Sequence, residues 1–141
     1  MTACAKCQHD PDAAVIARWE FTIPRDLPSL NERIHNGAKG WKYRATRDAW
    51  AADLRAIRFA NRIPHIGASP PTTRRRVTLV RVYSGRQKEM DRANLDSKAC
   101  VDAMIISGLI VDDSPSWLEL HVLQERGTER GTRVLIEELS Q

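Results

Sequence analysis

The sequence lacks any run of about eighteen consecutive apolar residues, the shortest stretch that usually crosses a membrane as a helix. Its N-terminal segment also lacks the apolar core of a secretory signal peptide, so we expect a cytoplasmic protein with no membrane partner. Cysteine is scarce and odd in number, with Cys4, Cys7 and Cys100 as the 3 examples, which argues against a disulfide framework. The 141 residues hold no internal repeat and no low-complexity segment, and their number suits one domain.

The N-terminal residues 1–13 are polar and small, and they are interpreted as a flexible tail. Cys4, Cys7 and His9 resemble the first half of a zinc site, which is the alternative interpretation. A structural zinc site needs four ligands, and no second Cys-x-x-Cys or histidine pair follows. The other histidines are scattered at His35, His65 and His121. We therefore treat the two thiols as incidental.

Residues 14–141 are interpreted as a single domain whose elements follow from the spacing of apolar residues. Strands are expected at residues 15–23, 76–83, 117–124 and 132–138, and helices at residues 43–61 and 92–107. A glycine-containing loop joins the last two strands, which predicts a hairpin. The order β-α-β-α-β-β predicts an α+β (α/β) domain with two helices on one mixed β-sheet.

Basic residues give the chain a formal net charge of +4, which favours an anionic partner. They form three clusters: Arg74–Arg76; Arg81, Arg86, Lys88 and Arg92; and Lys39, Lys42, Arg44 and Arg47. For any single cluster, a solvated surface is the better explanation. Because the three clusters flank an acidic motif, together they favour the binding of phosphate groups.

The acidic motif begins at the second expected helix, residues 92–107. At about 100° per residue, Asp91, Lys98 and Asp102 fall on one stripe within the apolar sector of this helix. Charges in such a place are tolerated only when they are paired or bound to a metal. The simpler alternative is a Lys98–Asp102 ion pair, with Asp91 as the N-cap of the helix.

A second pair of carboxylates, Asp112 and Asp113, follows shortly after Gly108, which is expected to end the helix. Asp-Asp-Ser-Pro is also good turn chemistry, so a plain turn is the alternative. If the chain returns to the start of the helix, three or four carboxylates converge, and such hard oxygen ligands suit Mg²⁺, with Mn²⁺ as a substitute. Such a site polarises a scissile phosphate, and Lys98 would stabilise the developing charge or orient the attacking water.

These residues resemble the RusA family of Holliday-junction resolvases of bacteria and phages. The family pattern of Asp-x-Asp-Asn, lysine, aspartate, glycine and an Asp-Asp pair is matched by Asp91, Asn94, Lys98, Asp102, Gly108 and Asp112–Asp113. The resemblance is firm over residues 76–138. It is looser over residues 15–62, where Pro28, Ser29, Asn31 and Arg33 look like the early loop of the family.

The resemblance implies a RusA-like homodimer that cuts branched DNA at symmetric positions with the help of magnesium. Because one site cuts one strand, resolving a four-way junction needs two sites related by a two-fold axis. Asp91 and Asp113 are the implied metal ligands, assisted by Asp112 and by the neutral oxygen of Asn94. Lys98 is the implied partner of phosphate or water, and Asp102 either orients Lys98 or joins the metal ligands.

The DNA surface is expected along the loop 25–42 and near residues 81–92. The basic residues proposed to contact DNA there are Arg33, Lys39, Lys42, Arg86, Lys88 and Arg92. Trp41 and Tyr43 either stack on opened bases or, as the preferred interpretation, pack under the loop.

One departure from the family pattern is Ala93, which stands where the family has its second aspartate. The chain also has one more residue between Asn94 and Lys98 than the shortest family spacing, and at helical spacing Asp96 points away from the acidic stripe. The loss of a carboxylate favours a second hypothesis, a dimer that binds branched DNA without efficient cleavage. A third hypothesis is an α+β domain that binds protein partners.

Overall fold

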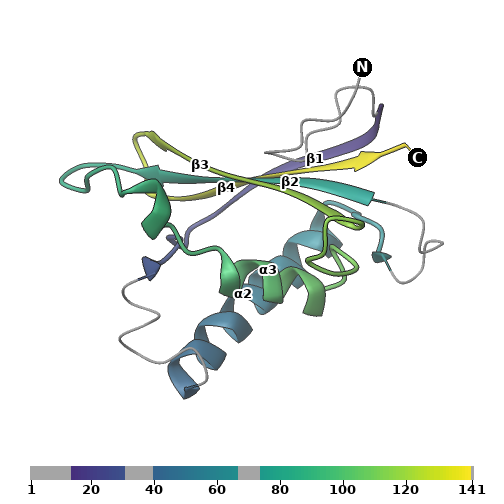
Figure 1. Ribbon diagram of the computed structural model, residues 1–141, viewed down its shortest axis with the longest axis horizontal. Helices are drawn as coiled ribbons and strands as arrows, with labels where there is room; N and C mark the ends of the chain where they lie inside the picture. Colours follow the sequence, from purple (N-terminus) through teal and green to yellow (C-terminus); the bar gives the residue numbers. More distant parts are fainter. Residues whose placement is uncertain (1–13, 31–39, 67–73, 141) are drawn as a thin grey trace.

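The computed structural model describes residues 14–30, 40–66 and 74–140. In these ranges, 4 strands form one mixed sheet in the order β1-β4-β2-β3. The strands are β1 (Val15–Ile23), β2 (Arg74–Tyr83), β3 (Leu118–Arg126) and β4 (Gly131–Leu139). The helices α2 (Trp41–Ala60) and α3 (Lys98–Ile106) both lie on one face of the sheet (Figure 1). The predicted mixed sheet with two helices, in the order β-α-β-α-β-β, is confirmed.

The hairpin predicted for the last two strands is wrong. β4 lies between β1 and β2 and pairs antiparallel with both, whereas β3 pairs parallel with β2 at the edge of the sheet. The connection from β3 to β4 passes the end of β2, where Gly127 N donates to Tyr83 O at 2.9 Å. The alternation of apolar residues identifies a strand, but it does not identify its neighbour. The helical crossover from β2 through α3 to β3 makes that pair parallel.

The single helix predicted over residues 92–107 is also wrong, because the chain leaves helical geometry in the middle. A short 3-10 helix, η2 (Arg92–Asn94), precedes an extended Leu95, and α3 begins only at Lys98. The backbone of this break bonds to the loop before α2, where Asp96 N donates to Pro28 O at 3.0 Å and Leu95 bridges to Ser29. The stripe of Asp91, Lys98 and Asp102 on one continuous helix therefore does not exist.

The core fills the space between the helices and the sheet. Trp50 and Leu54 of α2 and Met104 of α3 are almost completely buried against Leu79 and Ile136 of the central strands. The odd cysteine, Cys100, is also buried there, and burial raises the pKa of its thiol to about 12, so it stays neutral and unreactive. This packing fixes α3, which carries Lys98 and Asp102, against the sheet.

The arginine run at the start of β2 belongs largely to the fold and not to a phosphate-binding surface. The Arg75 side chain is 1% exposed and donates to Leu109 O at 2.7 Å and to Pro64 O at 3.2 Å. It also pairs with Glu138 at 3.2 Å and lies over the Trp19 ring. Arg76, on the opposite face of the sheet, pairs with buried glutamates of the neighbouring strands. The charge pattern alone could not show this, because it does not reveal which arginines face the core.

No helix in the described part of the chain is long and apolar enough to cross a membrane.

Candidate functional site

One pocket of about 400 Å³ lies between the start of α3 and the start of β3. We call it the acidic pocket, because its charged lining consists of Asp96, Lys98, Asp102 and Asp113. Apolar side chains complete most of its wall: Leu30, Leu95, Val101, Leu118 and Leu120. The structure thus brings together three of the residues that the sequence singled out, two from α3 and one from the turn that follows it.

Lys98 and Asp102 lie one turn apart on α3 and form an ion pair, with 3.4 Å between Lys98 Nζ and Asp102 Oδ2. The hydroxyl of Tyr43, in the first turns of α2, donates a hydrogen bond to the same carboxylate oxygen. Lys98 Nζ also lies 5.9 Å from the centroid of the Tyr43 ring. The predicted Lys98–Asp102 pair is confirmed. Because it is partly exposed, it contributes no more than about 1 kcal/mol to stability, and its main effect is to fix the ammonium at the pocket.

Asp96 is the pocket residue that the sequence did not predict. Asp96 is only 5% exposed, and its Oδ1 accepts at 3.2 Å from the backbone N–H of Lys98, the first residue of α3. On an unbroken helix Asp96 would point away from Lys98. The break at residues 95–97 turns it into the pocket instead. An aspartate directly before the N-cap Ser97 often bonds a backbone N–H two residues on, which is the signal that could have revealed it.

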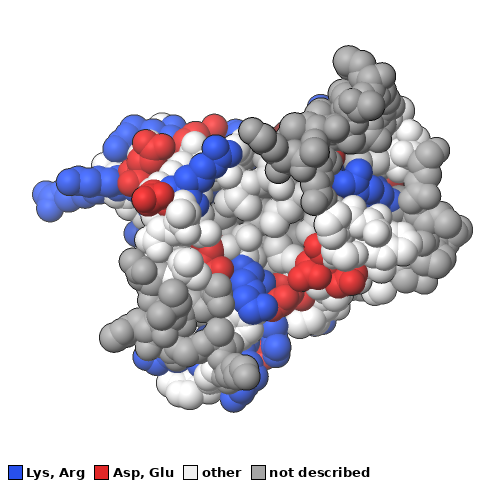
Figure 2. All heavy atoms as spheres, in the orientation of Figure 1, with Lys and Arg blue, Asp and Glu red and all other residues white. Residues whose placement is uncertain are grey.

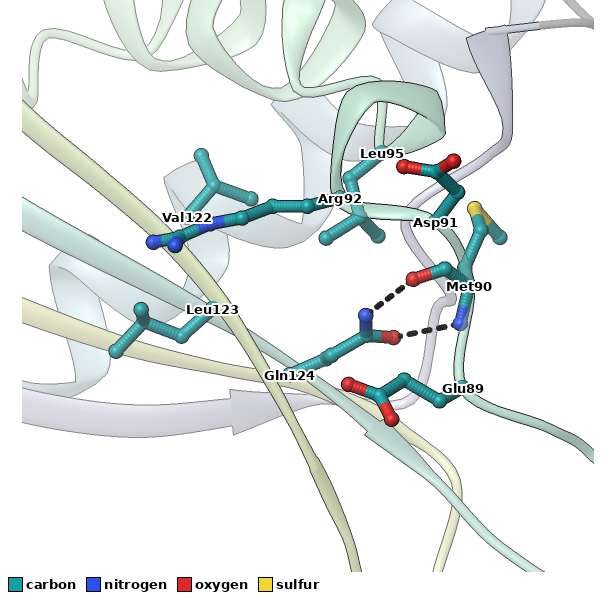
Figure 3. A pocket seen from close by; sticks show the side chains of 8 residues that line it. All are labelled: Glu89, Met90, Asp91, Arg92, Leu95, Val122, Leu123 and Gln124. Atoms are coloured by element: carbon teal, nitrogen blue, oxygen red, sulfur yellow. Dashed lines mark hydrogen bonds between the residues drawn. The ribbon is translucent and has the colours of Figure 1, made fainter.

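Asp91 lines a second, adjoining pocket of about 610 Å³ between residues 89–95 and the outer part of β3 (Figure 3). We call this the β3-edge pocket, and Leu95 lines both pockets. Asp91 Oδ1 accepts from Ala93 N at 3.0 Å, so the predicted N-cap role is confirmed for the 3-10 helix. Figure 3 shows Arg92 reaching across this pocket toward Val122.

The remaining predicted carboxylate and amide, Asp112 and Asn94, line neither pocket. Asp112 is exposed, and its Oδ1 accepts from Asp113 N at 2.8 Å. The two adjacent aspartates therefore differ in environment: Asp113 faces the acidic pocket, and Asp112 supports the turn before it. The turn expected as the simpler alternative for Asp-Asp-Ser-Pro and a return of Asp113 to the start of α3 coexist. The aspartates were expected to return near Asp91, but Asp91 lines the other pocket and Asp112 lines neither.

No three of the His, Cys, Asp and Glu residues in the described ranges are grouped closely enough to hold one metal ion. Mg²⁺ commonly uses only one or two protein carboxylates and completes its octahedron with water and substrate phosphate. Asp91 and Asp113 line different, adjoining pockets, and the oxygen donors of each fit that mode of binding, in which water or a phosphate group supplies the remaining ligands.

One basic side chain lines each pocket: Lys98 the acidic pocket and Arg92 the β3-edge pocket. Of the predicted DNA contacts, Lys42, Arg86, Lys88 and Arg92 are exposed, whereas Arg33 and Lys39 lie outside the described residues. Figure 2 shows Lys and Arg side chains projecting at the end of the sheet that carries the turn after β2, and a mixed row of acidic and basic side chains along the molecule. Arg81 is buried and cannot contact DNA.

Trp41, at the first position of α2, is 69% exposed. The preferred interpretation that it packs under the loop is therefore wrong for Trp41. Tyr43, two residues on, is half-buried against Lys98 and Asp102. The two aromatic residues thus have different environments, although they are close in sequence.

Comparisons with protein-family models and with curated proteins found no match for this chain.

Tyr43 should ionise at a much higher pH than an ordinary tyrosine. Burial, followed by the hydrogen bond from its hydroxyl to Asp102, raises its pKa well above the ordinary value of 10.0. The stability that this group contributes is therefore fully present below pH 10.0 and is lost as the pH rises through the raised pKa. The chain has only 2 tyrosines, so in a Tyr83→Phe background the ultraviolet absorbance of tyrosinate reports Tyr43 alone. Adding Asp102→Asn should shift the transition back toward 10.0, and an unchanged transition would contradict the contact.

Proposed function

We propose that the protein is a structure-selective endodeoxyribonuclease that resolves Holliday junctions and other branched DNA by metal-dependent phosphodiester hydrolysis. The observation that supports this most is the acidic pocket, in which Lys98, Asp102 and Asp113 lie together. Lys98 and Asp102 lie on α3, and Asp113 follows after the end of this helix and Gly108. A protein with net charge +4 that concentrates carboxylates beside one lysine has a site suited to a cation and a phosphate. The resemblance to the RusA family points to the same activity.

In this proposal each side chain has a defined part. Asp91 and Asp113, from the two adjoining pockets, would hold a Mg²⁺ ion, which would supply Lewis-acid activation of the scissile phosphate and of the attacking water. Lys98 donates to a non-bridging phosphate oxygen, where negative charge grows as water attacks and the P–O bond to the leaving oxygen breaks. Asp102 and Tyr43 keep the Lys98 ammonium directed into the pocket. Asp112 and Asn94 act from outside the pocket by supporting the segments that carry Asp113 and Asp91.

The substrate and the assembly follow from the same site. A single acidic pocket cuts one strand, so the paired cuts that resolve a junction require a homodimer with two-fold symmetry. The proposed DNA surface includes Lys42, Arg86, Lys88 and Arg92, with Arg33 and Lys39 of the preceding loop. We place the protein in the cytoplasm, where it would meet bacterial or phage DNA.

A second candidate is a dimer that binds branched DNA without cutting it efficiently. Ala93 favours it, because this exposed position, directly beside Asn94, carries a methyl group where the resembled family has a carboxylate.

Cleavage of a labelled synthetic four-way junction would test the proposal, with linear duplex of the same sequence as the control. We expect paired nicks in Mg²⁺ or Mn²⁺ and none in EDTA. Binding that weakens steeply with salt, without nicks in either metal, would instead establish the binding module. If the protein neither binds nor cuts the junction, both DNA hypotheses fail and a protein-binding domain remains.

A further inference from the structure

The segment between β2 and η2, residues 84–91, carries Asp91 at its end and has no strand partner of its own. Side chains from the neighbouring strands hold it in place instead. Arg126 of β3 donates to Gly85 O at 3.2 Å and to Gln87 O at 3.3 Å. Further along, Arg81 of β2 donates to Lys88 O at 3.1 Å. The path of the chain up to Asp91 therefore depends on β2 and β3 through their side chains.

Gln124 makes the last and closest of these attachments. Its Oε1 accepts from Met90 N at 2.9 Å, and its Nε2 donates to Met90 O, as the dashed lines in Figure 3 show. A primary amide that bonds both the N–H and the carbonyl of one residue fixes the position and the orientation of that backbone. It acts here as a strand would, one residue before Asp91.

Buried Arg81 determines which way the Gln124 amide faces. The two residues are paired across the β2–β3 register, and Arg81 Nη1 donates to Gln124 Oε1 at 3.1 Å. A flipped amide would present its NH₂ group to the guanidinium, donor against donor, because arginine has no acceptor. Arg81 is 6% exposed, so a lost hydrogen bond there would not be replaced readily by water.

We infer that Gln124, oriented by Arg81, is a positioning residue that sets the place of the Asp91 carboxylate beside the acidic pocket. Asp91 is then held from both sides, by the Gln124–Met90 bonds before it and by its own bond from Ala93 N after it. This inference rests on the proposed function, in which Asp91 is a metal ligand. Its general basis is that misplacing a reacting or binding group by about 1 Å can reduce the rate by about 10²-fold.

The test compares Gln124→Leu with Gln124→Glu. Leucine removes both bonds to Met90. Glutamate keeps oxygen acceptors for Met90 N and Arg81, but it sets its second carboxylate oxygen, which cannot donate, against Met90 O. For Gln124→Leu we expect fast hydrogen exchange at the Met90 amide and altered Asp91 and Ala93 amide resonances. We also expect junction kcat to fall by about 10–10²-fold with junction Kd unchanged. Gln124→Glu should recover part of each property, because it keeps the bond from Met90 N.

Glu125→Gln is the matched control, since Glu125 is the next residue of β3, faces the other side of the sheet and pairs with Arg133 at 2.9 Å. It should leave Met90 exchange and kcat as in the wild type. The inference is overturned if Gln124→Leu matches the wild type in Met90 exchange, or if exchange rises while the Asp91 resonances and kcat stay unchanged. If the wild type does not cleave, the nuclease proposal fails separately. The exchange rates and Asp91 resonances then still decide whether Gln124 positions Asp91.

Discussion

Replacing Asp113 with asparagine should reduce cleavage of a four-way junction by at least about 10²-fold. Loss of groups that merely support a metal ligand already reduces affinity or activity by about 10–10²-fold, so loss of a ligand should have a larger effect. Asp113 is exposed at a turn before β3, so the substitution should leave the unfolding transition almost unchanged. Single-turnover cleavage at several Mg²⁺ concentrations is the measurement, since a weakened metal site also shifts the Mg²⁺ dependence.

The adjacent residue supplies a control that few sites offer. Asp112 has the same chemistry and the same formal charge, but it lies outside the acidic pocket, and its Oδ1 accepts from Asp113 N. Asparagine keeps that acceptor, so Asp112→Asn should retain activity within about tenfold of the wild type, as expected for a supporting group. Equal losses in both variants would indicate a general effect of negative charge, and full activity in Asp113→Asn would remove Asp113 from the site.

Replacing Arg75 with methionine should lower the free energy of unfolding by about 3–5 kcal/mol, the usual effect of removing one partner of a buried ion pair. The Arg75 side chain is almost completely buried, and its loss removes a donor from Glu138, Leu109 O and Pro64 O. Burial lowers the pKa of the Arg75 guanidinium, while Glu138 opposes that effect. Urea unfolding followed by circular dichroism measures the change.

Two further variants separate the buried charge from the arginine run as a whole. Arg74→Met, at the neighbouring half-buried position, removes a hydrogen bond to Pro115 O and should change stability by about 1 kcal/mol or less. Arg75→Met combined with Glu138→Leu should recover part of the loss, because replacing both partners of a buried pair with apolar groups is often neutral. If Arg75→Met unfolds at the wild-type urea concentration, the buried pair has no stabilising role.

The local pattern of apolar residues predicted the elements well, because alternation and helical spacing are properties of short segments. The strand at residues 15–23 has the predicted bounds, and the second helix of the chain was misjudged only where it breaks. The order of strands was not predictable from these patterns. Residues 117–124 alternate in the same way whether their neighbour is β4, as expected, or β2, as found.

The candidate site was predicted in part for the same reason. Lys98 and Asp102 are four residues apart on one helix, so their contact follows from local geometry. Asp96 and Asp91 were misplaced because the break at residues 95–97 depends on Pro28 and Ser29, far away in sequence. The sequence also did not show which arginine of residues 74–76 faces the core. Arg75 is held there by Glu138 and by Leu109 O, which are far away in sequence. The catalytic, metal-binding and DNA-binding roles of these residues stay predictions.

The break before α3 has a consequence for how much the length of the chain can vary here. Adding one residue to an unbroken helix turns everything beyond the insertion by about 100°. Lys98 and Asp102 would then leave the acidic pocket. In this protein an additional residue between Asn94 and Lys98 can be taken up by non-helical backbone, while packing of Met104 and Leu109 keeps the register of α3. Insertions and deletions at residues 95–97 are therefore the length changes that this segment should tolerate best.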